Sequence, residues 1–174
     1  MLKLRDLRES DREMYLKAGS CEPGCEKLLT DELIANTMWS LAFGGKGKRK
    51  IYVIENIECD FLGYCSIESG ITPEIGICLL QSFQGKGLGV VAIRLLWEEI
   101  CKERNLEYFV ARVEKSNVYS IKMFEKLGAK VMENEESSLL LNLRKIAEED
   151  KKYASILSEM QEFSNEIVQF AISF

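Results

Sequence analysis

The segment with the clearest chemical meaning covers residues 84–89 and reads QGKGLG, between a strand-like and a helix-like run. Three glycines within five residues let the backbone turn tightly and approach a ligand without interference from Cβ atoms. Several backbone N–H groups then converge at the start of a helix, where the helix dipole also favours a negative charge. Lys86 adds a positive charge beside them. The segment therefore predicts a cradle for a pyrophosphate.

Two other nucleotide-binding motifs compete with this interpretation. A P-loop requires the pattern Gly-x4-Gly-Lys-Ser/Thr, which the glycine-rich segment does not supply. A dinucleotide-binding turn, G-x-G-x-x-A, does fit Gly87, Gly89 and Ala92, and Glu114 ends the next strand-like run. However, residues 81–86 separate the preceding strand-like run from Gly87, and too few α/β units follow to complete a doubly wound sheet. The pyrophosphate cradle is the better fit, and a nicotinamide-dependent reductase stays as an alternative.

The composition removes several classes of chemistry. No histidine occurs in the 174 residues, which excludes Ser-His and Cys-His nucleophilic pairs and nearly every common catalytic zinc site. The close cysteine pair, Cys21 and Cys25, has no second pair to complete a metal site, so we predict no metal. The formal net charge of −5 argues against a general nucleic-acid-binding role. Any chemistry must use carboxylates, amines, hydroxyls, backbone amides or a cofactor.

The sequence also bears on the cellular compartment. No apolar run approaches the ~18 residues that a membrane span needs, and the chain does not open on a signal peptide. Cys65, Cys78 and Cys101 stand in apolar runs, as small buried side chains do. We therefore predict a cytoplasmic protein without membrane contact and without a disulfide framework.

A scaffold of strands and helices must position the glycine-rich segment. Strand-like runs cover residues 1–5, 51–54, 61–67, 74–80, 108–113, 129–132 and 139–141. One helix-like run begins near residue 10, and three more cover residues 30–41, 90–101 and 118–127. This order predicts an α/β (α+β) fold with a central mixed sheet of about seven strands, flanked by helices. The glycine-rich segment then joins the fourth strand to a helix.

The C-terminal residues follow a different pattern. Apolar side chains recur three and four positions apart at Tyr153, Ile156, Met160, Phe163, Ile167, Phe170 and Phe174. We predict that residues 1–143 form one domain and that residues 144–174 add an amphipathic helix. Such a helix packs either on its own sheet or against a second copy. Burial of its phenylalanines contributes roughly 1.5–3 kcal/mol for each side chain, and this favours a homodimer.

Two blocks of the sequence resemble the GNAT acetyltransferase superfamily. The acetyl-CoA signature of that family, Q/R-x-x-G-x-G/A, is met by Gln84, Gly87 and Gly89. Residues 117–129 are similar to the N-x-x-[AS]-x-x-x-[YF]-x-[KR]-x-G-F element of ribosomal-protein and polyamine acetyltransferases. The resemblance covers residues 1–143 and implies the mixed sheet of the GNAT fold, with acetyl-CoA as the cosubstrate.

The resemblance also implies which residues hold the coenzyme. The strand backbone before the glycine-rich segment would bond the pantetheine arm, the amides of that segment would hold the pyrophosphate, and the second block would add contacts. The expected coenzyme-binding residues are Ile77, Cys78, Leu79, Gln84, Gly85, Lys86, Gly87, Leu88, Gly89, Val90, Asn117, Ser120 and Phe124.

The sequence departs from the family pattern at two proton-transfer positions. Phe124 stands where many relatives have a tyrosine that protonates the departing thiolate, and Arg112 stands where several have a glutamate base. A base is still needed, because an amine must be neutral to attack a thioester. Glu74 and Glu68, at the ends of neighbouring strand-like runs, are the candidate bases, and Glu114 comes third.

These features predict an N-acetyltransferase that moves an acetyl group from acetyl-CoA to a primary amine by direct attack in a ternary complex. The alternative is a catalytically weak CoA-binding or sensor module of the same fold that acts through its C-terminal helix. The sequence does not identify the acceptor amine, the acyl chain or the oligomeric state.

Overall fold

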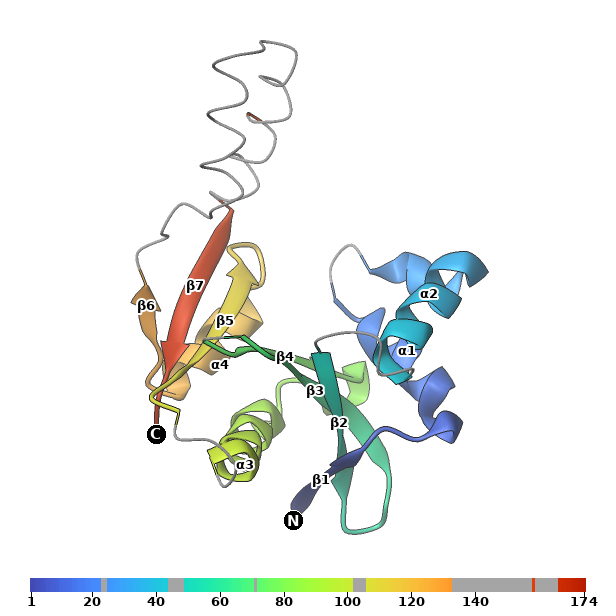
Figure 1. Ribbon diagram of the computed structural model, residues 1–174, viewed down its shortest axis with the longest axis horizontal. Helices are drawn as coiled ribbons and strands as arrows, with labels where there is room; N and C mark the ends of the chain where they lie inside the picture. The colour runs from blue at the N-terminus through green and yellow to red at the C-terminus, as the bar shows by residue number, and fades with distance from the viewer. Residues whose placement is uncertain (23–24, 44–48, 71, 102–105, 133–157, 159–165) are drawn as a thin grey trace.

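A computed structural model describes residues 1–22, 25–43, 49–70, 72–101, 106–132, 158 and 166–174. In this part of the chain, one seven-stranded mixed sheet has the strand order β1-β2-β3-β4-β5-β7-β6 (Figure 1). Helices cover both faces of the sheet, which confirms the predicted α/β fold class. Among the described helices, none combines the length and the hydrophobicity needed to cross a bilayer.

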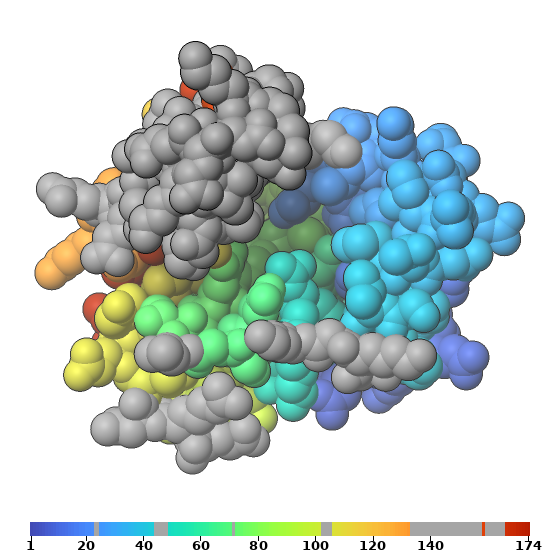
Figure 2. Space-filling model, turned by 45° about the horizontal axis from the view of Figure 1, so that its top comes forward, coloured from blue at the N-terminus to red at the C-terminus, as the bar shows by residue number. Residues whose placement is uncertain are grey.

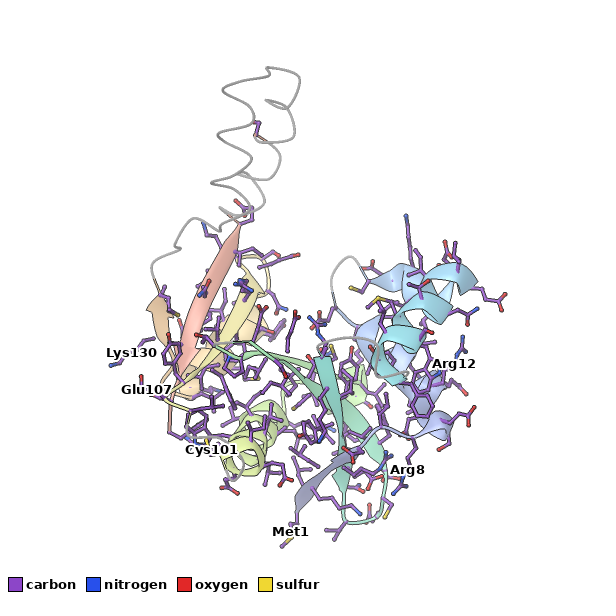
Figure 3. The ribbon with its side chains drawn as sticks, viewed as in Figure 1. Met1, Arg8, Arg12, Cys101, Glu107 and Lys130 are labelled. Atoms are coloured by element: carbon purple, nitrogen blue, oxygen red, sulfur yellow. The ribbon has the colours of Figure 1, made fainter. Side chains whose placement is uncertain are left out.

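The first half of the sheet is antiparallel. It consists of β1 (Leu2–Asp6), β2 (Arg49–Asn56), β3 (Phe61–Glu68) and β4 (Glu74–Leu79), each paired with the next. Two helices, α1 (Arg12–Gly19) and α2 (Glu32–Phe43), lie between β1 and β2 in the chain and on one side of the sheet in space (Figure 1). Arg12, the first residue of α1 and labelled in Figure 3, donates a hydrogen bond of 2.6 Å to Oδ1 of Asn36 on α2.

The second half of the sheet begins with the only parallel pair of neighbouring strands in the described residues. Helix α3 (Leu88–Cys101) crosses over to β5 (Phe109–Glu114), which lies parallel to β4. Then follow α4 (Val118–Lys126), β6 (Lys130–Met132) and β7 (Ile167–Ile172). Both β5 and β6 pair with β7 in antiparallel fashion.

The alternation of side chains along the strands divides the core between the two faces. On the face that carries α3 and α4, Cys65 and Ile75 of the sheet belong to one buried cluster with Leu96. On the opposite face, Tyr64 packs with Tyr15 of α1, and their ring centroids lie 4.6 Å apart. The second face therefore holds α1 and α2 against β2, β3 and β4.

A buried ionic cluster joins the start of α1 to the first two strands. Arg5 on β1 donates to both carboxylate oxygens of Asp11, over 2.6 and 2.9 Å, and pairs with Glu55 on β2. The Asp11 carboxylate also accepts a 2.7 Å bond from the Arg8 amide. Burial raises the pKa of Asp11 and Glu55 more than any other single cause. The hydrogen bonds and charges of Arg5, together with those of Arg8 on Asp11 and of Lys3 on Glu55, outweigh it and hold both pKa values below their usual range.

The C-terminal segment differs from the predicted helix. Residues Ile167–Ile172 form strand β7, which lies between β5 and β6. A short apolar run is compatible with either a strand or a helix. Here residues 167–172 form a strand because they pair with β5 on one side and β6 on the other. Because both edges of β7 are paired, its backbone groups are satisfied while Phe170 enters the core. The helix prediction is therefore wrong for these residues.

The other C-terminal predictions fall on residues that the structure does not describe. These are the strand predicted at 139–141, the helix predicted over 144–157 and 159–165, and the predicted domain boundary after residue 143. Phe170 is 1% exposed, so it offers no apolar surface to a second copy. The homodimer stays a prediction that this residue does not support.

The position of β7 predicts different costs for two C-terminal phenylalanines. Phe170→Ala should lower the free energy of unfolding by about 3–5 kcal/mol, because it leaves a cavity beside Phe124. Phe174→Ala should cost only about 0.5–1.5 kcal/mol, since that ring is 45% exposed and contacts the edge of Trp97. Urea unfolding measures both values. Equal costs would contradict the placement of β7 inside the sheet.

The Arg5 cluster predicts a loss of stability in acid. A carboxyl group whose pKa is lowered by folding contributes stability above its unfolded pKa of ~4, and this contribution is lost as the pH falls further. Asp11→Asn should cost about 1.5–3 kcal/mol at pH 7, and the difference from wild type should shrink below pH ~4. Denaturant unfolding between pH 2 and pH 7 tests this, with exposed Glu13→Gln as the control. A pH-independent difference would show that Asp11 does not act through its charge.

Candidate active site

The candidate site begins where β4 separates from β5. Only one residue pair, Glu74 with Val110, joins these strands in the described residues, together with a 2.9 Å bond from the Val110 amide to the Pro73 carbonyl. The other edge of β4 is paired with β3 as far as Leu79. Beyond the first pair, the backbone groups of β4 that point away from β3 have no strand neighbour among the residues that the structure describes. This edge can therefore bind an extended ligand.

The open edge contains the three β4 residues expected to hold the pantetheine arm. Ile77, Cys78 and Leu79 are all partly exposed, in contrast to the buried residues of β3. In the space-filling view, the green atoms of β4 and the segment after it lie set back between the blue N-terminal helices and the yellow atoms of β5 (Figure 2). A ligand can thus approach β4 from the surface.

The glycine-rich segment continues from the end of β4. Gln84 Nε2 donates a 2.9 Å bond to the Leu79 carbonyl, and this contact ties the segment to the strand. Gly85 and Gly87 have φ angles of 71° and 76°, a conformation that residues with a Cβ rarely adopt. Lys86 is exposed beside them, with Nζ 5.6 Å from the Phe83 ring centroid.

The backbone amides of this segment are available to an anion. Outside regular helix and strand bonding, none of the backbone hydrogen bonds found in the described residues is donated by residues 85–90. Leu88, Gly89 and Val90 form the first turn of α3, where amides lack intrahelical partners. The donors, the helix dipole and Lys86 together fit a pyrophosphate.

Gly89 has a packing role as well. A Cβ at this position would lie 2.4 Å from Sδ of Met123 on α4. The absence of a side chain therefore lets the N-terminal turn of α3 lie against α4. The same contact brings the second sequence block close to the glycine-rich segment.

The predicted residues of the second block have different surroundings. Asn117 caps α4, where its Oδ1 accepts a 3.1 Å bond from the Ser120 amide, and both residues are partly exposed. Phe124 is 3% exposed and its ring stacks on that of Phe170, with the centroids 5.5 Å apart. The family's tyrosine position is thus filled here by a core ring. Tyr119, which is 86% exposed, points into solvent.

Both predicted bases are paired with arginine side chains. Glu74 forms an ion pair with Arg112, across the point where β4 and β5 separate. Glu68 lies directly opposite Glu74 in the β3–β4 register and is 3.3 Å from Arg49. Because an arginine engages each carboxylate, neither is free to accept a proton without losing an ion pair.

A further carboxylate lies on the same side of β4, and no motif in the sequence indicates it. Glu22, in the turn after α1, interacts electrostatically with Cys78 on β4, and Tyr64 on β3 is the register partner of Cys78. Burial raises the pKa of Glu22, Tyr64 and Cys78, although Glu22 as a whole residue is exposed. These residues come from a turn and two strands, so no local spacing could have indicated the cluster. No group of three or more metal-ligating side chains is found in the described residues.

Comparisons with a family model and with solved structures relate this chain to known acetyltransferases. A family model described as an acetyltransferase (GNAT) domain matches residues 1–130. No functionally curated protein matches the chain. A domain from Methanocaldococcus jannaschii has 19% sequence identity and a TM-score of 0.66, covering 100% of this chain and 99% of its own.

Two further solved structures share the fold. Spermidine N-acetyltransferase from Vibrio cholerae, in complex with CoA and spermine, has 18% identity and a TM-score of 0.60, over 76% of this chain and 82% of its own. An acetyltransferase of the GNAT family from Bacillus anthracis has 19% identity and a TM-score of 0.62, over 76% of this chain and 81% of its own.

The free amides predict that Gly87→Glu abolishes coenzyme binding. Saturation at 100 times the dissociation constant adds about 2.7 kcal/mol of stability, so acetyl-CoA should raise the melting temperature of the wild type by several degrees. A carboxylate in the cradle should remove this shift. Gly128→Glu is the matched control, because Gly128 has a φ of 78° at the end of α4 and should incur the same backbone strain. Loss of the shift in both variants would mean that strain, and not the cradle, is responsible.

Proposed function

The chain belongs to the GNAT family of N-acetyltransferases, and we propose that it transfers an acetyl group from acetyl-CoA to a primary amine that carries positive charge. The observation that carries this proposal is the continuity of unpaired backbone groups from the open edge of β4 into the amides of residues 85–90. An extended edge followed by an anion cradle suits a ligand with a pantetheine arm and a pyrophosphate.

Backbone groups of this chain carry most of the expected coenzyme contacts. The open edge of Ile77, Cys78 and Leu79 orients the pantetheine arm, and the amides from Gly85 onward hold the pyrophosphate. Acetyl-CoA, when bound, supplies an acetyl group that is activated as a thioester. A thiol with a pKa near 8.5 leaves readily, so the lack of a tyrosine at position 124 is tolerable. Alignment of amine and thioester can itself contribute ~7–11 kcal/mol.

The charges beside the open edge support a cationic acceptor. Glu68, Glu74 and Glu114 share one face of the sheet by register and alternation, and Glu22 approaches from the turn after α1. Arg49 and Arg112 lie on the same face and compensate two of these four carboxylates, so the described part of this face has an excess of negative charge. Such a surface attracts polycations such as polyamines. The spermidine N-acetyltransferase of the same fold, which was solved with CoA and spermine, adds support.

An amine panel tests the proposed function. Acetyl-CoA is mixed with the protein and with spermidine, a lysine-containing peptide, an aminoglycoside or a neutral amine, and release of the CoA thiol is measured. We expect thiol release with the polycationic amines, and a kcat/KM for them that falls as salt is raised, because the attraction is electrostatic. The neutral amine is the control for this attraction.

The other outcomes separate the competing interpretations. An acetyl-CoA melting shift without thiol release from any amine would favour the CoA-binding module over the enzyme. A melting shift with NAD(P)H but with neither CoA species would favour the reductase and overturn the proposal.

A further inference from the structure

A pair of charged side chains crosses the opening between β4 and β5. In the described residues, the two strands share only the pair Glu74 with Val110. Arg112 follows Val110 by two positions, so it projects from the same face of β5, beyond the last backbone pair. From there its guanidinium forms an ion pair with the Glu74 carboxylate on β4. A side-chain bridge, the Arg112–Glu74 clasp, therefore lies across the closed end of the opening.

The direction of the bound coenzyme leads its acyl end to this clasp. Under the proposed function, the pyrophosphate lies at residues 85–90 and the pantetheine arm along Leu79 to Ile77. The thioester then comes next along the strand, at Gly76, and the acyl group points towards Glu74. Because a strand rises by about 3.3 Å per residue, only about 10 Å separate Ile77 from Glu74.

The space around Gly76 is limited in the other directions. A Cβ at Gly76 would lie 2.8 Å from Oγ of Ser66, a buried residue of β3. On the opposite face of β4, Ile75 is buried in the core and Ile77 packs against the same cluster. Within the described part of the chain, the direction left to an acyl group beyond Ile77 is therefore along the opening, towards the clasp.

We propose, on the basis of the acetyl transfer proposed above, that the Arg112–Glu74 clasp determines which acyl chain the enzyme accepts. An acetyl group ends before the clasp, whereas a longer chain runs into it. Such a chain must displace the ion pair or bury it against methylene groups. Burial of an ion pair in apolar surroundings is costly, because both ions lose their water. Arg112 and Glu74 are thus specificity-determining residues that restrict the donor to short acyl chains.

A second ion pair on the same face provides an internal comparison. The side chains of Arg112 and Glu74 are 53% and 31% exposed, and those of Arg49 and Glu68 are 52% and 45% exposed. Ion pairs with this exposure add little to stability, so the loss of either should leave the fold intact. However, Arg49 and Glu68 are register partners on two paired strands, β2 and β3. Their ion pair does not cross the opening and should not affect the acyl chain.

Titration calorimetry of the whole chain with acetyl-CoA, butyryl-CoA and hexanoyl-CoA tests the clasp. For the wild type, the dissociation constant should rise with chain length, by about 10-fold or more for hexanoyl-CoA, as is common where the shape of a site excludes a larger group. Arg112→Ala should remove most of this difference because it opens the closed end. Glu74→Gln should remove less of it, since Arg112 stays in place. Arg112→Lys should keep the wild-type preference, because an ammonium group can still pair with Glu74.

Arg49→Ala is the matched control for Arg112→Ala. It removes the same charge from the same face, so it weakens the attraction of the anionic coenzyme in a similar way, but it should keep the wild-type preference among the acyl chains. An equal preference in all variants, an equal change in both alanine variants, or a wild type without preference would overturn the clasp and leave the proposed function standing. If the wild type binds none of the three donors, the proposed function fails and the clasp fails with it.

Discussion

The parting of β4 from β5 after a single residue pair is the constraint on which the site depends. A sheet that continued its parallel ladder would satisfy the backbone groups of β4 internally, and no edge would be left for a ligand. Unpaired backbone groups are tolerable only where water or a ligand reaches them, since each one costs about 1–3 kcal/mol when it is buried without a partner. The site must therefore lie at the surface, as the partial exposure of residues 76–79 shows.

Two other features keep the sheet together on either side of this opening. On one side, the Arg5 cluster ties β1, β2 and the start of α1 into one unit, so that α1 is fixed against the face that carries Tyr64. On the other side, β7 fills the gap between β5 and β6 and brings Phe170 into the core beneath α4. The opening is thus a gap between two firmly packed halves. The polar groups that border it come from both halves, with Glu22 and Cys78 on one side and Arg112 on the other.

Some parts of the site could be predicted because their signals are local. The left-handed turns at Gly85 and Gly87 need glycine, whatever the rest of the chain does, so three glycines near a helix start already indicate an anion cradle. Asn117 is a helix cap by residue type and position, and the structure uses it as one. The strands and helices up to residue 132 follow from hydrophobic periodicity in the same way, because each pattern is complete within a few residues.

The sequence by itself thus determined the fold class, the family and the position of the glycine-rich segment before α3. Only the tertiary structure decided which polar side chains meet. The register of the sheet sets Arg112 against Glu74, and the packing of α1 brings Glu22 to Cys78, although nothing near either residue in the chain indicates the other. In the same way, the gap between β5 and β6 makes residues 167–172 a strand. Contacts between distant segments depend on how whole strands and helices pair and pack. The spacing of residues within one segment therefore does not predict them.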